Sequence, residues 1–136
     1  MTQRRILIVE DEHIVAMGIK RMLKSLMYTV TGIASSGEEA ISKAESTFPD
    51  VVLMDIMLKG EIDGIEAAKE IREKFEIPII YLTAYSESNI LERAKGTEPL
   101  GYIIKPFDEN DLYSSIEVAL HRYEKEKSAK KIQEEK

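Results

Sequence analysis

Five short apolar runs recur along the chain, separated by segments of mixed apolar and charged residues. The runs are Arg5–Val9, Thr29–Ile33, Val51–Met54, Ile77–Leu82 and Gly101–Ile104. Three of them are almost continuously apolar, which is typical of strands that helices cover on both faces. The run at 29–33 is interrupted by threonine and glycine, and this weaker pattern suits the edge of a sheet.

The segments between the runs favour amphipathic helices. In 12–25, for example, apolar residues recur at spacings of three and four. Ser36, Asp63 and Asp108 lie where three of these segments begin, and serine and aspartate are preferred helix caps. We therefore expect helices over 12–25, from Ser36 to before Pro49, from Asp63 through Ile71, over roughly 87–95, and from Asp108 through Leu120.

This alternation of strand and helix predicts an α/β fold. Parallel strands joined by right-handed crossovers give a doubly wound (βα)₅ sheet with helices on both faces. In such sheets, binding sites lie at the carboxyl ends of the strands, near the point where the strand order reverses. The residues that follow each run are therefore the first candidates for function.

Charged or hydroxyl-bearing residues follow four of the five runs. They are Glu10, Asp11 and Glu12 after the first run, Asp55 after the third, Thr83 after the fourth and Lys105 after the fifth. Each of them alone would be an ordinary helix cap, turn residue or surface lysine. Because the carboxyl ends of parallel strands meet at one edge, the set predicts an acidic pocket that also holds a lysine.

An acidic pocket of this kind indicates phosphoryl chemistry. Crowded carboxylates repel one another and need a cation, and hard oxygen ligands suit Mg²⁺, or Mn²⁺ in its place. Asp55 offers a carboxylate nucleophile of the type that forms aspartyl phosphate. Phosphoryl transfer requires mainly positioning and charge neutralisation, which the Lys105 ammonium and the Thr83 hydroxyl could supply beside the cation.

Composition narrows the class of protein. The 136 residues suffice for one domain, and 43% hydrophobic with 32% charged residues is typical of a globular protein. No run reaches the length of a membrane span, and the N-terminus does not resemble a secretory signal. The absence of cysteine excludes disulfides and thiolate metal sites. A net charge of −6 argues against direct nucleic-acid binding, and we expect a cytoplasmic protein.

The last fifteen residues differ from the rest of the chain. Ten of the residues in 122–136 are charged, and the segment has almost no apolar stripe. We therefore divide the chain into a domain over 1–121 and a charged helical extension over 122–136. The extension is either a solvated continuation of the last helix or a linker to an output or sensor domain that this chain lacks. The sequence leaves both interpretations open.

Five motifs, in order, resemble the receiver domains of two-component response regulators, the CheY-like superfamily. They are ILIVEDE at the first strand, VVLMDIML around Asp55, DGIEAA at a helix start, PIIYLTA before and including Thr83, and GYIIKPF ending after Lys105. The resemblance covers about residues 4–121. It implies a flavodoxin-like three-layer sandwich whose five parallel strands have the order 2-1-3-4-5.

The resemblance also implies roles for individual residues. Asp55 would accept a phosphoryl group from the phosphohistidine of a sensor histidine kinase or from a phosphotransfer protein. Asp11, Asp55 and the backbone carbonyl of Met57 would bind Mg²⁺ directly, and Glu10 would act through water. Lys105 would pair with Asp55 before transfer and with the phosphoryl oxygens afterwards. The peptide bond between Lys105 and Pro106 would be cis, an isomer that is tolerated before proline.

Output is expected at a second group of residues. Thr83 and Tyr102 match the family's switch pair, which would change the face formed by the fourth helix, the fifth strand and the fifth helix. Ala84 is small and would leave the phosphoryl group accessible, which fits slow self-catalysed hydrolysis. The protein would then be a signalling domain and not an enzyme acting on other substrates. It would work as a monomer or a weak phosphorylation-dependent dimer, through an output domain after residue 121 or a separate effector.

Some features depart from the commoner family pattern or leave other functions open. The acidic pair is Glu10-Asp11 where two aspartates are commoner, Glu12 is interpreted as a helix-start residue, and Lys59 as a solvated turn residue. A metal-dependent phosphatase or phosphomutase is disfavoured, because Met57 occupies the place of a second catalytic aspartate. A binding domain that is never phosphorylated stays possible, whereas a nucleotide-binding function lacks a glycine-rich phosphate loop.

Overall fold

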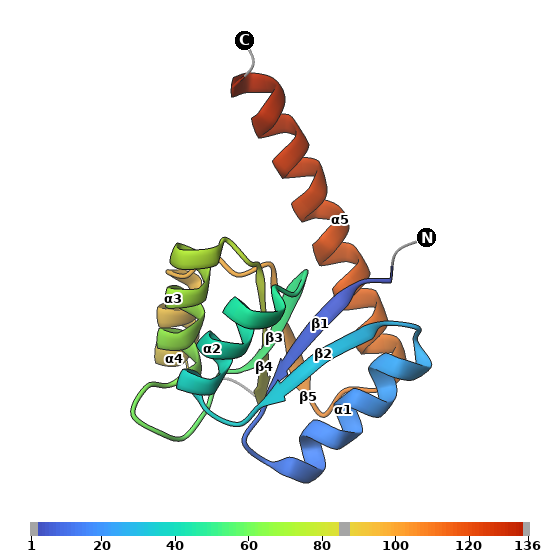
Figure 1. Ribbon diagram of the computed structural model, residues 1–136, viewed down its shortest axis with the longest axis vertical. Coiled ribbons are helices and arrows are strands. Elements are labelled where there is room, and N and C mark those ends of the chain that lie inside the picture. Colours follow the sequence, from blue (N-terminus) through green and yellow to red (C-terminus); the bar gives the residue numbers. More distant parts are fainter. Residues whose placement is uncertain (1–2, 85–87, 135–136) are drawn as a thin grey trace.

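The computed structural model describes residues 3–84 and 88–134 (Figure 1). The elements, in order, are β1 (Arg5–Val9), α1 (His13–Ser25), β2 (Thr29–Ala34), α2 (Gly37–Thr47), β3 (Val51–Asp55), α3 (Gly64–Phe75), β4 (Ile79–Ala84), α4 (Ser88–Lys95), β5 (Gly101–Lys105) and α5 (Glu109–Glu134). All five predicted strands and helices are present. The expected first residue of the fourth helix, Glu87, lies outside the described residues.

The five strands form one parallel sheet in the order β2-β1-β3-β4-β5. This confirms the predicted doubly wound fold and its strand order. Helices α1 and α5 pack on one face, and α2, α3 and α4 pack on the other (Figure 1). The chain is therefore a three-layer sandwich, and β1 and β3 lie at its centre, where the strand order reverses.

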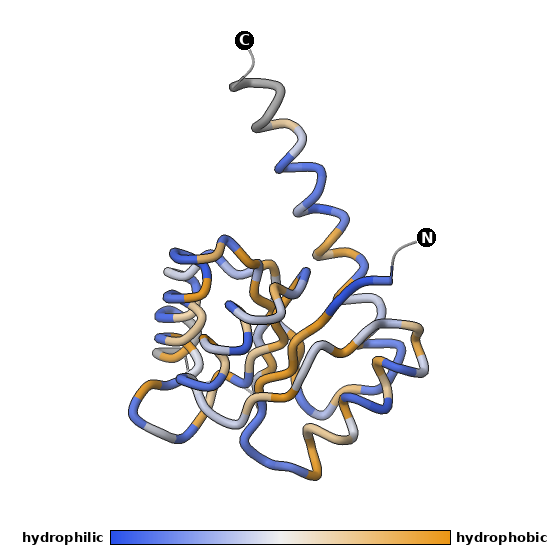
Figure 2. The backbone as a smooth tube through the Cα atoms, in the orientation of Figure 1, coloured by the Kyte–Doolittle hydropathy of each residue, from blue (hydrophilic) through white to orange (hydrophobic). Residues whose placement is uncertain are grey.

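The central strands are apolar at every position because both of their faces are covered. Along β1, Leu7 and Val9 enter the core beneath α2 and α3, whereas Ile6 and Ile8 enter the core beneath α1 and α5. Figure 2 shows the same strands as the most hydrophobic part of the backbone. The second strand is only partly buried and lies at the edge of the sheet, as its weaker pattern predicted.

Helix α1 ends in a Schellman motif whose left-handed position is occupied by Met27. The Met27 N–H donates to the Lys24 carbonyl at 3.0 Å, and the Tyr28 N–H donates to the Leu23 carbonyl at 2.9 Å. Met27 has φ of 71°, and the residue is 67% exposed. Glycine normally occupies this position, because a Cβ makes the left-handed conformation unfavourable.

Met27→Gly is therefore expected to raise the free energy of unfolding by about 0.5–1 kcal/mol, since it relieves this strain and removes few contacts. Urea denaturation would measure the change. Met17→Gly is the matched control, because Met17 lies inside the same helix and is also exposed. There the substitution should lower stability by about 1 kcal/mol. Equal losses from both variants would contradict the assignment of strain to Met27.

Helix α5 continues without a break past the predicted domain boundary. Among the α5 residues whose burial the structure describes, 109–129, the buried ones are Leu112, Ile116, Ala119 and Leu120, the face that the sequence predicts. Beyond them the helix projects away from the sheet to Glu134 (Figure 1). Arg122 donates to the Leu100 carbonyl and Glu124 pairs with Arg4 at the point where the helix leaves the body. No described helix is long and apolar enough to cross a membrane.

Candidate functional site

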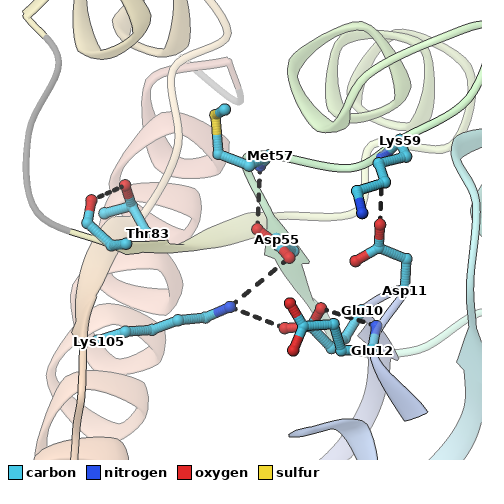
Figure 3. Close-up of polar contacts among 9 residues, drawn as sticks. Glu10, Asp11, Glu12, Asp55, Met57, Lys59, Thr83 and Lys105 are labelled. Carbon is cyan, nitrogen blue, oxygen red and sulfur yellow. Dashed lines mark hydrogen bonds and ion pairs between the residues drawn. The ribbon is translucent and has the colours of Figure 1, made fainter.

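Three strands deliver charged side chains to one pocket (Figure 3). Glu10 and Asp11 directly follow β1, Asp55 is the last residue of β3, and Lys105 is the last residue of β5. The strand order places β1 next to β3, and β4 separates β3 from β5. Lysine is long enough to span that extra strand. The structure thus brings together four of the five charged residues that follow the predicted strands, all except Glu12.

The three acids form a cluster with the geometry of a cation site. One carboxylate oxygen from each of Glu10, Asp11 and Asp55 lies within 4.8 Å of the others. Glu10 and Asp55 are only 2% and 6% exposed, so water screens their mutual repulsion poorly. A set of hard carboxylate oxygens at this density fits a divalent cation such as Mg²⁺. The described residues therefore provide a pocket that could bind a metal.

Asp55 is held by its own chain. Its Oδ1 accepts the backbone N–H of Met57 at 3.0 Å, and the neighbouring Ile56 N–H donates to the Leu82 carbonyl of β4. Met57 itself lies at the surface, and the residue is 57% exposed. The role of its carbonyl as a metal ligand stays a prediction.

Lys105 lies between two carboxylates but contacts one of them more closely. Its Nζ is 2.8 Å from Glu10 Oε1 and 3.6 Å from Asp55 Oδ2. Burial alone would lower the pKa of Lys105, but the hydrogen bond to Glu10 and the charge of Asp55 outweigh it, so the pKa lies above its usual value. The ammonium is therefore firmly protonated. The sequence predicts the pairing with Asp55 but not the shorter contact with Glu10. The Lys105–Pro106 peptide bond is cis.

The expected switch residues lie on the α3 and α4 side of the sheet. Thr83 is 7% exposed, and its hydroxyl donates to the Ala84 carbonyl at 2.8 Å (Figure 3). The Tyr102 ring stacks on Tyr81 with centroids 5.9 Å apart. Among the described residues, no group hydrogen-bonds to the buried Tyr102 hydroxyl. The Thr83 hydroxyl thus donates within β4.

Tyr81 and Thr97 extend this group and are absent from the sequence prediction. Their hydroxyls are 2.7 Å apart, and Thr97 also donates to the Ala94 carbonyl near the end of α4. Burial raises the pKa of Tyr81 to about 12. Because Tyr81 and Thr83 are two residues apart on one strand, their shared face follows from the period of a strand. The contact between Tyr81 and Thr97 cannot be predicted in this way, because Thr97 lies in a turn.

A sequence model of the response regulator receiver domain matches residues 6–117. The chain belongs to this family. Its relatives include the transcriptional regulatory protein PdtaR of Mycobacterium tuberculosis, which is 42% identical over 120 residues, or 88% of this chain and 58% of that protein. The chain spans about half the length of the curated relatives that it matches.

Solved structures of receiver domains have the same fold. The signal receiver domain of a modulated diguanylate cyclase from Desulfovibrio desulfuricans G20 superposes with a TM-score of 0.87 at 38% identity, over 92% of this chain and 99% of that one. The N-terminal domain of a response regulator/sensory box/GGDEF 3-domain protein from Carboxydothermus hydrogenoformans gives 0.82 at 37% identity, over 90% and 98%. The chain is thus a receiver domain of a two-component response regulator.

Two further polar residues lie at the rim of the receiver pocket. Glu12 is the N-cap residue of α1 and lies outside the carboxylate cluster, although its N–H donates to Glu10 Oε2 at 3.2 Å. The exposed Lys59 places its backbone N–H 3.4 Å from Asp11 Oδ2. Both contacts use the backbone, so neither side chain is needed to explain the geometry of the pocket.

Proposed function

We propose that this receiver domain accepts a phosphoryl group on Asp55 in an Mg²⁺-dependent reaction. The donor is the phosphohistidine of a sensor histidine kinase or of a phosphotransfer protein. An Asp55 carboxylate oxygen forms the new bond to phosphorus, and the bond between phosphorus and the imidazole nitrogen breaks with its electron pair left on that nitrogen. The observation that carries the proposal is the meeting of Asp55 with two acids and one lysine in a single pocket.

The chain's own residues have separate tasks in this reaction. Asp11, Asp55 and the Met57 carbonyl would hold Mg²⁺ directly, with Glu10 acting through water, and Mn²⁺ could replace it. The bound ion supplies positive charge that offsets the phosphoryl oxygens. Lys105 would add a second positive charge beside Asp55, and the raised pKa of Lys105 keeps that charge in place. Asp55 is positioned by the Met57 N–H.

The response would pass through Thr83 and Tyr102. In the unphosphorylated structure the Thr83 hydroxyl donates to the Ala84 carbonyl. After phosphorylation it would turn towards the new phosphoryl oxygens. Tyr102 stacks on Tyr81 and would adjust with it, changing the surface of α4, β5 and α5. The small Ala84 leaves the phosphoryl group open to water, so the domain would slowly hydrolyse its own aspartyl phosphate. It would act on no other substrate.

The output would lie beyond residues 1–121. PdtaR and other relatives are named as transcriptional regulators and are about twice as long as the matched region. We propose two alternatives for the output. The helical extension over 122–136 leads to an output or sensor domain, or the receiver acts on a separate effector protein. The receiver itself would work in the cytoplasm, as a monomer or a weak phosphorylation-dependent dimer.

Intact-mass measurement with acetyl phosphate as the donor tests the proposal. The expected result is the gain of one phosphoryl group with Mg²⁺, none with EDTA, and none in Asp55→Asn. Glu45→Gln is the control, because Glu45 is an exposed acid near the end of α2 and lies outside the carboxylate cluster. It should accept the group as the wild type does.

Two outcomes would contradict the proposal. Equal labelling of Asp55→Asn would place the phosphoryl group elsewhere. An unmodified wild type, tested with acetyl phosphate and with a phosphorylated histidine kinase, would favour a binding domain that works without phosphorylation.

A further inference from the structure

The carboxylate nearest to the Lys105 ammonium belongs to Glu10. The 2.8 Å separation from Glu10 Oε1 is that of a charge-assisted hydrogen bond, whereas 3.6 Å from Asp55 Oδ2 is too long for a direct one. Figure 3 shows Lys105 reaching across the pocket to both residues. The lysine is thus bonded to Glu10 and is only electrostatically attracted to Asp55.

Glu10 is itself held firmly. Its side chain is 1% exposed, and its second oxygen, Oε2, accepts the backbone N–H of Glu12 at 3.2 Å. The Glu10 N–H donates to the Ala34 carbonyl at 2.9 Å, which anchors the backbone at the end of β1. Both carboxylate oxygens and the main chain therefore have fixed partners, so Glu10 can orient a flexible lysine that is 25% exposed.

We propose that Glu10 is a positioning residue for Lys105. It keeps the ammonium beside Asp55 but out of hydrogen-bonding contact with it, and this inference rests on the proposed function of Asp55. Two consequences favour reaction. Asp55 Oδ2 is free of a direct bond that an incoming phosphoryl group would have to displace. The positive charge is already in place for the oxygens of that group, so little reorganisation remains at the moment of transfer.

The length of the Glu10 side chain is as important here as its charge. Glu10→Asp keeps the charge but shortens the side chain by one carbon–carbon bond, about 1.5 Å, so the carboxylate no longer reaches Lys105. Glu10→Gln keeps the reach but loses the charge, and its single oxygen can accept from Lys105 only by giving up the Glu12 N–H. A residue that serves only a metal ion through its charge should tolerate aspartate better than glutamine. A residue that positions Lys105 should tolerate glutamine better than aspartate.

The first measurement follows Lys105 directly, in EDTA and without a phosphodonor. NMR of ¹⁵N-labelled protein would report how well the Lys105 NH₃⁺ protons are protected from exchange with water, with Lys105→Arg used to assign the signal. We expect the strongest protection in the wild type, weaker protection in Glu10→Gln, and its loss in Glu10→Asp. Loss in Asp55→Asn but not in Glu10→Asp would overturn the proposal, because Asp55 would then be the residue that holds the lysine.

The second measurement is the rate of phosphoryl acceptance from acetyl phosphate at saturating Mg²⁺. Glu10→Asp should lower the maximal rate about tenfold, the effect of one lost charge-assisted hydrogen bond, and Glu10→Gln should lower it less than Glu10→Asp does. A higher rate for Glu10→Asp than for Glu10→Gln, or no change in either, would overturn the positioning role. Should the wild type itself accept no phosphoryl group, the proposed function fails, and the NMR result still decides which residue holds Lys105.

Discussion

Gly64→Ala is expected to lower the free energy of unfolding by about 3 kcal/mol and to displace Asp55. A Cβ on Gly64 would lie 2.1 Å from the Asp55 carbonyl oxygen and 3.2 Å from Ile56 Cα. Both neighbours are backbone atoms, so no side chain can rotate away to make room. Relief requires the start of α3 to separate from the end of β3, where the phosphoacceptor candidate lies.

Gly18→Ala is the matched control for the same added methyl group. Gly18 lies within α1, and a Cβ there would meet nothing within 4 Å. Alanine is the better helix former, so this variant should gain about 0.5–1 kcal/mol. Urea denaturation of both variants, with phosphoryl labelling of Gly64→Ala, would check the contrast. A Gly64→Ala protein that matches the wild type in stability and labelling would show that the junction is not tightly packed.

The pattern of apolar residues is enough to predict the fold, because this architecture buries its strands on both faces and so makes them continuous apolar runs. Ile6 to Val9 show the reason, since neighbouring residues of β1 enter different cores and all must be apolar. The pocket was also predictable, because parallel strands bring their carboxyl ends to one edge whatever the details of packing. Asp55, a single acid after a strand, acquires significance only from the residues at the ends of the other strands.

The sequence is least informative where the distance between particular atoms decides the outcome. Whether Lys105 bonds to Glu10 or to Asp55 depends on the lengths of three side chains in one pocket. The constraint on Gly64 depends on how closely a helix start approaches a strand end. Neither distance has a signature in residue types alone. Both distances follow from how β3 is placed relative to α3 and to β5, which lies on the far side of β4.

The predicted ends of the strands are less accurate than their number and order, because the ends depend on hydrogen bonds that the spacing of apolar residues does not reveal. The sequence predicts the fourth strand over Ile77–Leu82, but β4 covers Ile79–Ala84. Thr83 and Ala84 pair with Ile104 and Lys105 of β5, so they belong to the sheet and do not merely follow it. This pairing places Thr83 rigidly beside the pocket. The apolar character of Ile77 comes from burial against the core, and its position precedes the strand.

Lys105→Ala is expected to lower the free energy of unfolding by about 2–3 kcal/mol in EDTA. The variant leaves the buried carboxylates of Glu10 and Asp55 without their cation, and an uncompensated buried charge is strongly destabilising. This expected loss of stability is smaller than the loss from breaking a fully buried ion pair, because the Lys105 side chain is 25% exposed. Lys59→Ala is the control, since Lys59 is an exposed lysine beside the same pocket. It should change stability by less than about 0.5 kcal/mol.

Mg²⁺ should restore most of the stability that Lys105→Ala loses, because a bound divalent ion neutralises the same carboxylates. The effect of pH has a definite sign. The folded protein raises the pKa of Lys105, so the lysine stabilises the wild type below its ordinary pKa of about 10.4, and this advantage is lost as the pH rises through the raised value. Thermal unfolding of both proteins between about pH 7 and 11, with and without Mg²⁺, would measure the difference. A deficit in Lys105→Ala that Mg²⁺ leaves unchanged would mean that Lys105 stabilises the fold through packing of its aliphatic chain and not through its charge.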